Sequence, residues 1–271
     1  MITNKLNALC KSGWITATLS VFVFLRTLCS PTSVQARWQT IVSGESFQNA
    51  AAFTSAWNYA YPWGNDQNGS ARMFVTNVVA SNGMVTLSAW PVAVAGSEGV
   101  SSKNPHLEIH YNSGTFYLKQ QIIINAQFPN WDMSVQARVP SVIGTWPAVW
   151  FTGAHSWPPE SDFMEFKGNS NCWQNTYNGK WQSVQTTVSS PDDWHSYRVV
   201  ANLENTTNVA FHYYIDGMLK TEQTSTTFVD SPCWLIVDFQ MEGSSGAPGP
   251  TVPQFFYVSN LVVRREESPT P

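Results

Sequence analysis

The stretch "WPPESDFMEF" (residues 157–166) places three carboxylic acids within six residues, in a chain of which only 12% of the residues are charged. Side chains alternate between the two faces of a strand, so Glu160 and Asp162 share one face. On a regular strand Glu165 points to the opposite face. One extra residue in the strand, a β-bulge, returns Glu165 to the face of the other two acids. The sequence therefore predicts a bulged strand with all three acids on one face.

Clustered carboxylates repel one another, and this repulsion raises the pKa of at least one of them. Glycoside cleavage uses that effect, because it needs one ionised carboxylate and one carboxylic acid that keeps its proton. A solvated acidic edge strand is a weaker alternative, because Phe163, Met164 and Phe166 make the segment half-buried. A calcium site is the other alternative, but it would also require oxygen ligands from loops.

Outward from this strand, the chain consists of short alternating segments separated by turn residues. Clear examples are "ARMFVTNVVASNGMVTLSAWP" (71–91), "DMSVQARVP" (132–140) and "VAFHYYIDGMLKTEQT" (209–224), the last with Asp216-Gly217 at a hairpin turn. No helical period is sustained over three turns. We expect about a dozen strands in an all-β, two-sheet antiparallel sandwich.

The N-terminal residues resemble an export signal. Lys5 and Lys11 precede the apolar run "WITATLSVFVFL" (14–25), and a small-residue site ends at Ala36. The run is too short to span a membrane. We therefore expect a cleaved signal peptide over 1–36, with a membrane anchor as the alternative. One catalytic-size domain over 37–265 and a disordered tail over 266–271 should follow.

The charge balance limits the partners. The chain has 14 Lys and Arg and 18 Asp and Glu, and removal of Lys5, Lys11 and Arg26 with the signal leaves 11 against 18. A net acidic protein is an unfavourable partner for nucleic acid and repels acidic polysaccharides at long range. A neutral partner is favoured, and no membrane contact is expected after signal cleavage.

The cysteines and sequons fit a secreted, monomeric glycoprotein. Cys172 and Cys233 are the two cysteines outside the signal, and in an oxidising compartment an even count predicts one disulfide. Asn68-Gly-Ser and Asn205-Thr-Thr are glycosylation sequons, which predicts that both segments lie on the surface. In "HLEIH" (106–110), two His and a Glu on a solvated face are commoner than a metal site, so we expect no metal.

The segment "GTWPAVWFTGAHSWPPESDFMEFKG" (144–168) resembles the active-site strand pair of glycoside hydrolase family 16, in which G-x-W-P-A-x-W leads into E-x-D-x-x-E. Further segments resemble the family in order over most of 105–265, among them "YNSGTFYLKQQ" and "PCWLIVDFQMEG". The resemblance implies a concanavalin-like β-jelly-roll with a sugar cleft on its concave sheet, and endo-acting retaining cleavage without a cofactor. It implies that Glu160 is the nucleophile, Asp162 its assisting carboxylate and Glu165 the general acid/base.

The bulged form of the motif is typical of the family's β-1,3-glucanases, agarases and galactanases. Candidate sugar-binding residues around the acids are Trp146, Trp150, His155, Trp157, Trp173, Gln174 and Gln240. The chain departs from the family pattern in three places. Ser161 replaces an aliphatic residue, "NCWQNTYNG" stands where many laminarinases carry a His-containing stretch, and "DFQMEG" (238–243) replaces N-x-x-x-G-G. Glucan and galactan therefore both remain open as the substrate.

Two other classes of protein are alternatives to a glycosidase. A non-catalytic lectin on the same fold would keep the tryptophans, but it would not need Glu160 and Glu165 together. A polysaccharide lyase abstracts a proton beside a uronate, and an acidic site repels a uronate. The paired acids favour the glycosidase over both.

Overall fold

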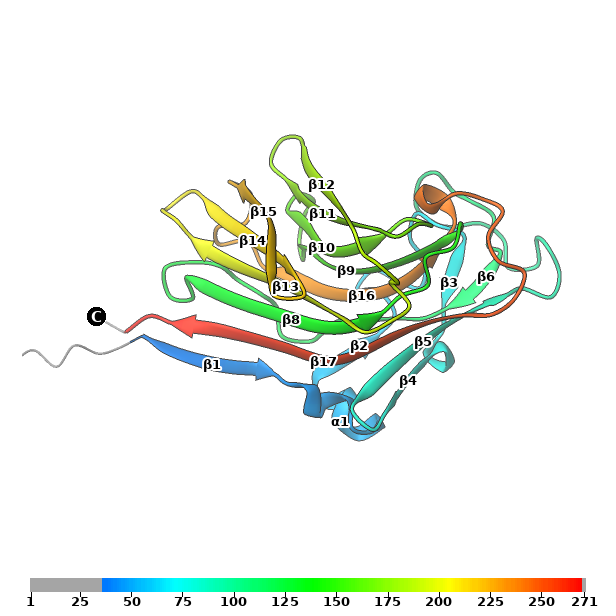
Figure 1. The fold of residues 1–271 in the computed structure, drawn as a ribbon, viewed down its shortest axis with the longest axis horizontal. Helices are drawn as coiled ribbons and strands as arrows, with labels where there is room; N and C mark the ends of the chain where they lie inside the picture. Colours follow the sequence, from blue (N-terminus) through cyan, green and yellow to red (C-terminus); the bar gives the residue numbers. More distant parts are fainter. Residues whose placement is uncertain (1–35, 270–271) are drawn as a thin grey trace, which may run out of the picture. The chain divides into compact units, whose positions relative to one another are not determined.

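The computed structural model describes residues 36–269 (Figure 1). The predicted signal peptide therefore lies outside the described residues, apart from Ala36, and stays a prediction. Within the described part of the chain, no helix is both long and apolar enough to cross a membrane.

Two antiparallel-dominated sheets form the domain. The outer sheet follows the order β15 (Met218–Ser225), β14 (Val209–Ile215), β13 (His195–Leu203), β8 (Asn130–Arg138), β17 (Gln254–Glu267), β5 (Met84–Pro91), β6 (Tyr111–Ser113) and β3 (Ala71–Met73), with β1 (Arg37–Val42) paired to β17 and β4 (Val78–Ser81) paired to β5. The inner sheet follows the order β12 (Trp181–Thr187), β11 (Asn171–Tyr177), β10 (Glu160–Phe166), β9 (Thr145–Gly153), β16 (Cys233–Met241), β7 (Thr115–Leu118) and β2 (Trp57–Tyr59). The predicted all-β sandwich is confirmed.

Helical structure is minor in residues 36–269. It comprises α1 (Ala50–Ala56) and the 3-10 turns η1 (Gly44–Phe47), η2 (Val75–Asn77) and η3 (Gly243–Ser245). The side chain of Asn49 caps α1 by accepting a hydrogen bond from the backbone N–H of Ala52.

The hairpin turns form where the sequence predicts them. Asp216 and Gly217 join β14 to β15 with φ of 52° and 75°, and Asn82 and Gly83 join β4 to β5 with φ of 54° and 79°. A two-residue turn with both φ values positive matches the right-handed twist of the flanking strands, and Asn, Asp and Gly accept it most readily.

The core lies between the sheets and is rich in aromatic rings. Phe151 of β9 contacts Phe211 of β14 at a ring distance of 5.9 Å, and Phe228 lies 4.7 Å from Phe211. All three side chains are at most 1% exposed. Truncating one such ring to Ala costs about 3–5 kcal/mol, so these contacts hold the inner sheet rigidly on the outer one.

The predicted disulfide is wrong. Cys172 and Cys233 are free and buried. Cys172 lies on β11 and Cys233 on β16, and β10 and β9 separate these strands in the sheet. Three strand spacings are about 14 Å, whereas a disulfide needs Cα atoms within about 7 Å.

The C-terminal boundary of the domain also differs from expectation. Strand β17 continues to Glu267 and pairs with β1 through Arg37 and Glu267, so the first two residues of the expected disordered tail belong to the sheet. The "HLEIH" segment is not a strand. Glu108 makes one isolated bridge to Val100, and His106 has a φ of 60°.

Candidate active site

The bulge in β10 lies where the sequence predicts it. Asp162 pairs with Trp150 of β9, but the next pairing, between Met164 and Val149, is shifted, and the pairing to β11 shifts between Asp162 and Glu165. The extra residue returns Glu165 to the face of Glu160 and Asp162. All three acids consequently line the same two pockets.

One pocket lies over the short side chain of Ala148 in β9, and we call it the Ala148 pocket. Its lining comprises the three acids, Gln67, Asn68, Trp146, Ala148, Trp150, Asp238 and Gln240. The other lies toward β11, and we call it the Trp173 pocket. Its lining comprises the three acids, Asn68, Trp146, Lys167, Trp173, Asn175, Trp181, Ser183 and Ser244. The two pockets therefore share the acids, Asn68 and Trp146 as a common wall.

Hydrogen bonds from the two neighbouring strands and from the β9–β10 connection hold the acids in place. The indole N–H of Trp157 donates to Glu160 Oε2 at 2.8 Å, and that of Trp146 donates to Glu165 Oε1 at 2.7 Å. The amide of Asn175 donates to Asp162 Oδ2 at 2.9 Å and to Glu165 Oε2 at 2.8 Å. One amide group thus ties the middle acid to the last one.

Lys167 is the cation of the site. Its Nζ lies 3.0 Å from Glu165 Oε2 and 4.7 Å from the ring centre of Trp173. The ammonium therefore neutralises part of the acidic cluster and also covers an aromatic surface in the Trp173 pocket.

Burial and mutual repulsion change the proton affinity of the acids. Burial, together with the charge of Glu165, raises the pKa of Glu160 to about 7, although the Trp157 hydrogen bond and the charge of Lys167 oppose the rise. Burial raises the pKa of Asp162 well above its ordinary value, and the charges of Glu165 and Glu160 add to the effect. At neutral pH the cluster therefore retains protons that isolated carboxylates would lose.

Ser161, which departs from the family pattern, is explained by the packing between the sheets. Its side chain is fully buried, and its hydroxyl lies 2.6 Å from the hydroxyl of Tyr213 on β14. Thr176 of β11 also bonds Tyr213. Phe163, Met164 and Phe166, which also belong to β10, are at most 1% exposed, so they anchor the bulged strand in the core.

Most of the predicted tryptophans lie at the acids. Trp146 and Trp150 flank the Ala148 pocket, and Trp173 lines the other pocket. Trp157 lines neither pocket, although its indole bonds Glu160. It lies beside Tyr177 and Trp181, with ring distances of 4.6 and 6.4 Å. These three rings form an exposed aromatic group next to Glu160.

One predicted sugar-binding residue, Gln174, does not face the cleft, whereas the role of His155 stays a prediction. Gln174 is fully buried on the core side of β11, where its amide group contacts Cys172 and Thr186. Its neighbours Trp173 and Asn175 face the cleft, and strand alternation excludes Gln174 from that face. His155 is exposed in the connection between β9 and β10 and lines neither pocket.

Gln240 does line the Ala148 pocket, and it is rigidly held. Its Oε1 accepts hydrogen bonds from the backbone N–H groups of Ala71 and Met241, both at 3.0 Å. Gly69 packs directly on it, because a Cβ there would lie 2.5 Å from Gln240 Oε1. The glycine of the sequon Asn68-Gly-Ser is therefore required by this close approach.

Sequence reasoning missed several residues that line the pockets. They are Gln67, Asn68, Lys167, Asn175, Ser183, Asp238 and Ser244. Gln67 and Asn68 lie in irregular chain far from the acids in sequence, so no strand period could place them. Asn68 gave a signal of another kind, the sequon, but it lines both pockets and Ser70 is only 2% exposed. Asn205, by contrast, is exposed in the turn between β13 and β14.

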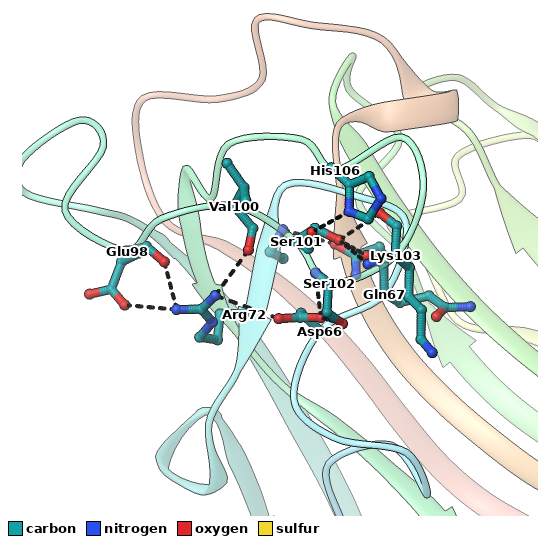
Figure 2. A network of polar contacts seen from close by, with 11 residues as sticks. Asp66, Gln67, Arg72, Glu98, Val100, Ser101, Ser102, Lys103 and His106 are labelled. Carbon is teal, nitrogen blue, oxygen red and sulfur yellow. Dashed lines mark hydrogen bonds and ion pairs between the residues drawn. The ribbon is translucent and has the colours of Figure 1, made fainter.

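A polar network holds the segment that carries Gln67 and Asn68 (Figure 2). Asp66 is 6% exposed, and its Oδ1 accepts hydrogen bonds from the backbone N–H of Ser102, at 3.0 Å, and from its hydroxyl. Arg72 lies 3.5 Å from Asp66 and donates to the carbonyl groups of Glu98 and Val100. The 98–106 loop is thereby fastened to one wall of the cleft.

Glu242 fastens the turn that packs beside Asn68 and Gly69, since a Cβ on Gly243 would lie 3.2 Å from the carbonyl oxygen of Asn68. Glu242 stands where the family pattern has Gly, and its φ of 55° is the left-handed conformation that favours Gly. Its buried carboxylate accepts from the backbone N–H of Gly249 at 2.9 Å and contacts His110 Nδ1 at 2.7 Å. These bonds offset the backbone strain and hold the turn η3, which brings Ser244 to the Trp173 pocket.

Residues 36–269 contain no group of three or more His, Cys, Asp or Glu side chains arranged to hold a metal ion. The side chains that line the two pockets offer carboxyl groups, amides, hydroxyls, one ammonium and aromatic rings. The arrangement suits proton transfer and nucleophilic attack on a ligand bound in the pockets.

Comparison with known proteins places this geometry in context. No family model matches the chain. The chain is 35% identical over 251 residues to a galactan endo-β-1,3-galactanase of Flammulina velutipes, and the match covers 91% of this chain and 99% of that protein.

Solved structures share the fold at lower identity. The catalytic domain of an endo-1,3-β-glucanase (laminarinase) of Thermotoga petrophila superposes with a TM-score of 0.65 at 20% identity, over 87% of this chain and 100% of the other. SCLam, a non-specific endo-β-1,3(4)-glucanase from family GH16, superposes with a TM-score of 0.64 at 18% identity, over 84% and 91% of the two chains. The predicted jelly-roll architecture is confirmed.

Proposed function

Because the chain belongs to glycoside hydrolase family 16 and is an endo-acting β-1,3-glycosidase, we propose that it hydrolyses β-1,3-galactan with retention of anomeric configuration. The observation that supports this mechanism best is the bulge that returns Glu165 to the cleft beside Glu160. A retaining glycosidase needs two carboxyl groups on one cleft, one to attack and one to transfer a proton.

In the proposed reaction Glu160 attacks the anomeric carbon while the glycosidic C–O bond breaks. Glu165 gives its proton to the leaving oxygen and becomes a carboxylate. A water then loses a proton to Glu165 and attacks the same carbon, which releases Glu160 and restores both acids. In each step one bond to the anomeric carbon forms, one breaks and one proton is transferred, with no change in oxidation state, so no cofactor is required.

Asp162 serves this cycle as a proton reservoir beside the nucleophile. Its pKa is raised by burial and by the charges of both glutamates, so a proton on Asp162 relieves their repulsion. The shared Asn175 amide keeps Asp162 and Glu165 close together through both steps. Trp146, Asn175 and Lys167 all contact the Glu165 carboxyl group and hold it in one position through both steps.

Cleavage inside a chain, rather than at its end, agrees with a cleft that extends from the acids in two directions, over Ala148 and toward Trp173. The Ala148 pocket and the Trp173 pocket can each bind one side of the scissile linkage. Indole faces stack on the C–H surfaces of sugars, and both pockets present tryptophan. A lectin would not need the acids at the junction, so that alternative is not favoured.

The choice of galactan rests on the relative from Flammulina velutipes, which matches nearly the whole chain. The protein is further proposed to be secreted, since residues 1–36 have the composition of a signal peptide. We propose that it acts as a monomer on this neutral polysaccharide.

Product analysis tests the proposal. The wild type and the variants Glu160→Gln and Glu165→Gln are incubated with debranched β-1,3-galactan, laminarin, mixed-linkage glucan and agarose. The wild type should release oligosaccharides from galactan with retained β-configuration by NMR, and both variants should lose about 10²–10⁴-fold in rate. Absence of cleavage by the wild type would refute the proposed function. Persistent activity of Glu160→Gln would refute the assignment of Glu160 as the nucleophile.

A further inference from the structure

We infer that Asp238, with Gln240 beside it, is a specificity-determining residue that accepts a hydrogen bond from the axial C4 hydroxyl of a galactose unit bound over Ala148. The inference deepens the proposed function and depends on it. It names the group in the cleft that distinguishes a galactan from a glucan.

Asp238 lies at the floor of the Ala148 pocket, across the sheet from the acids. It is on β16 and pairs with Ala148 of β9, which in turn pairs with Glu165 of β10. The residue is only 4% exposed, and it lines the pocket. The small side chain of Ala148 leaves room above the floor between Glu165 and Asp238.

One oxygen of Asp238 is held and the other is free. Oδ2 accepts a hydrogen bond of 2.5 Å from the hydroxyl of Tyr61, which is itself buried. Oδ1 is buried and has no hydrogen-bond partner among the described residues. The indole of Trp150 is near enough to lower the pKa of Asp238, but it forms no hydrogen bond of normal geometry with Oδ1. A buried acceptor without a partner is unfavourable in the free protein, and a ligand hydroxyl can relieve it.

Gln240 supplies the matching donor. Its Oε1 is occupied by two backbone N–H groups, and this fixes the amide plane. Its Nε2 has only a long contact of 3.5 Å, to the Tyr61 hydroxyl. A single sugar hydroxyl can therefore donate to Asp238 and accept from Gln240.

The position below the ring favours an axial hydroxyl. Trp146 and Trp150 stand on either side of Ala148 along β9 and confine a sugar unit laid over it. An equatorial hydroxyl lies near the mean plane of the ring, whereas an axial one projects away from it, toward the floor. Glucose and galactose differ only at C4, which is equatorial in the first and axial in the second.

The variant Asp238→Asn tests the inference. Tyr61 then donates to the Asn oxygen, and the Asn N–H₂ faces the sugar in place of an acceptor. At pH 8, where the Asp238 carboxyl is mostly ionised, the ratio of kcat/KM on β-1,3-galacto-oligosaccharides to that on laminari-oligosaccharides should fall about 10- to 100-fold, the loss expected for one hydrogen bond to a charged group. Asp132→Asn is the matched control, because Asp132 is a buried aspartate of the outer sheet, and it should leave the ratio unchanged.

A second measurement does not depend on the folding of a variant. The kcat/KM of the wild type should be about 10-fold or more lower on β-1,3-galacto-oligosaccharides that lack the C4 hydroxyl than on the unmodified ones. The kcat/KM of Asp238→Asn should be the same on both substrates. An unchanged substrate ratio in the variant, or full wild-type activity on the deoxy substrates, would overturn the inference while leaving the hydrolase intact. A wild type that prefers laminari-oligosaccharides would overturn it as well. Cleavage of neither polymer would instead refute the proposed function.

Discussion

The unpaired carboxylate of Asp238 should make the protein less stable as the pH rises, and Asp238→Asn should remove that dependence. Burial raises the pKa of Asp238 from its ordinary value of 3.8 to about 7, with the Tyr61 hydrogen bond opposing and the Glu165 charge adding to the rise. A raised pKa in the folded state means that the folded protein binds the proton more tightly than the unfolded chain. The stability that this group contributes is complete below pH 3.8 and is lost as the pH rises through 7.

The size of the effect follows from the two pKa values. One pKa unit is worth about 1.4 kcal/mol, so a rise from 3.8 to about 7 sets a ceiling of about 4 kcal/mol above pH 8. About 2–3 kcal/mol of this should develop between pH 5 and pH 8. For a domain of this length that corresponds to about 5–10 °C in melting temperature.

Urea denaturation at pH 5, 6, 7 and 8 measures the free energy of unfolding of the wild type and of Asp238→Asn. The free energy of unfolding of the variant, relative to that of the wild type, should increase steadily with pH. The new amide can add a constant difference, but that difference does not change with pH. Asp132→Asn should behave in the opposite way. Arg198 and Arg264 hold the pKa of Asp132 below its ordinary value, although burial alone would raise it, so its stabilising effect is present at high pH and lost in acid. A difference between Asp238→Asn and the wild type that does not change with pH would refute the reasoning.

Three further predictions concern the site and the cysteines. The charge of Lys167 lowers the pKa of Glu160, so Lys167→Met should move the acidic limb of the kcat/KM profile to higher pH, and an unmoved limb would contradict this. Asp66→Ala should loosen the 98–106 loop and raise KM several-fold with little change in kcat, as steady-state kinetics would show, whereas an unchanged KM in a folded variant would count against it. Cys172 and Cys233 should react with a thiol reagent only after denaturation, and a reductant should not lower the melting temperature. A lower melting temperature in the presence of reductant would instead support the predicted disulfide between these cysteines.

The fold and the acids could be predicted from sequence because both depend on local periodicity. Alternation in the strands and positive-φ residues in the turns are written in adjacent positions, and Asp216-Gly217 forms the expected turn. The bulge could be predicted for a chemical reason. Glu165 is misplaced on a regular strand, and only an extra residue brings it to Glu160.

The remaining features depend on pairings between distant segments, which one sequence does not encode locally. The disulfide failed because strand order, not cysteine count, decides which strands are neighbours, and two strands separate β11 from β16. The prediction for Gln174 is wrong because the sequence does not fix which alternate residues of β11 face the cleft. Neighbouring residues of a strand face opposite sides, so Gln174 and Trp173 cannot both face it. Gln67 and Asn68 reach the acids only through the network around Asp66, which is 36 residues from its partner Ser102.

Asp238 shows why the substrate was the hardest property to predict. In sequence it is one change from the Asn of the family pattern, inside an apolar strand where a carboxylate is unfavourable. The structure gives that carboxylate one partner, Tyr61, and leaves its other oxygen buried without a hydrogen-bond partner among the described residues. This unpaired oxygen destabilises the free protein, and it is also the atom proposed to bond the ligand. The stability of the protein and its specificity therefore depend on the same atom. The two therefore cannot be changed independently, so a variant that becomes more stable at high pH through this residue should also lose its preference for galactan.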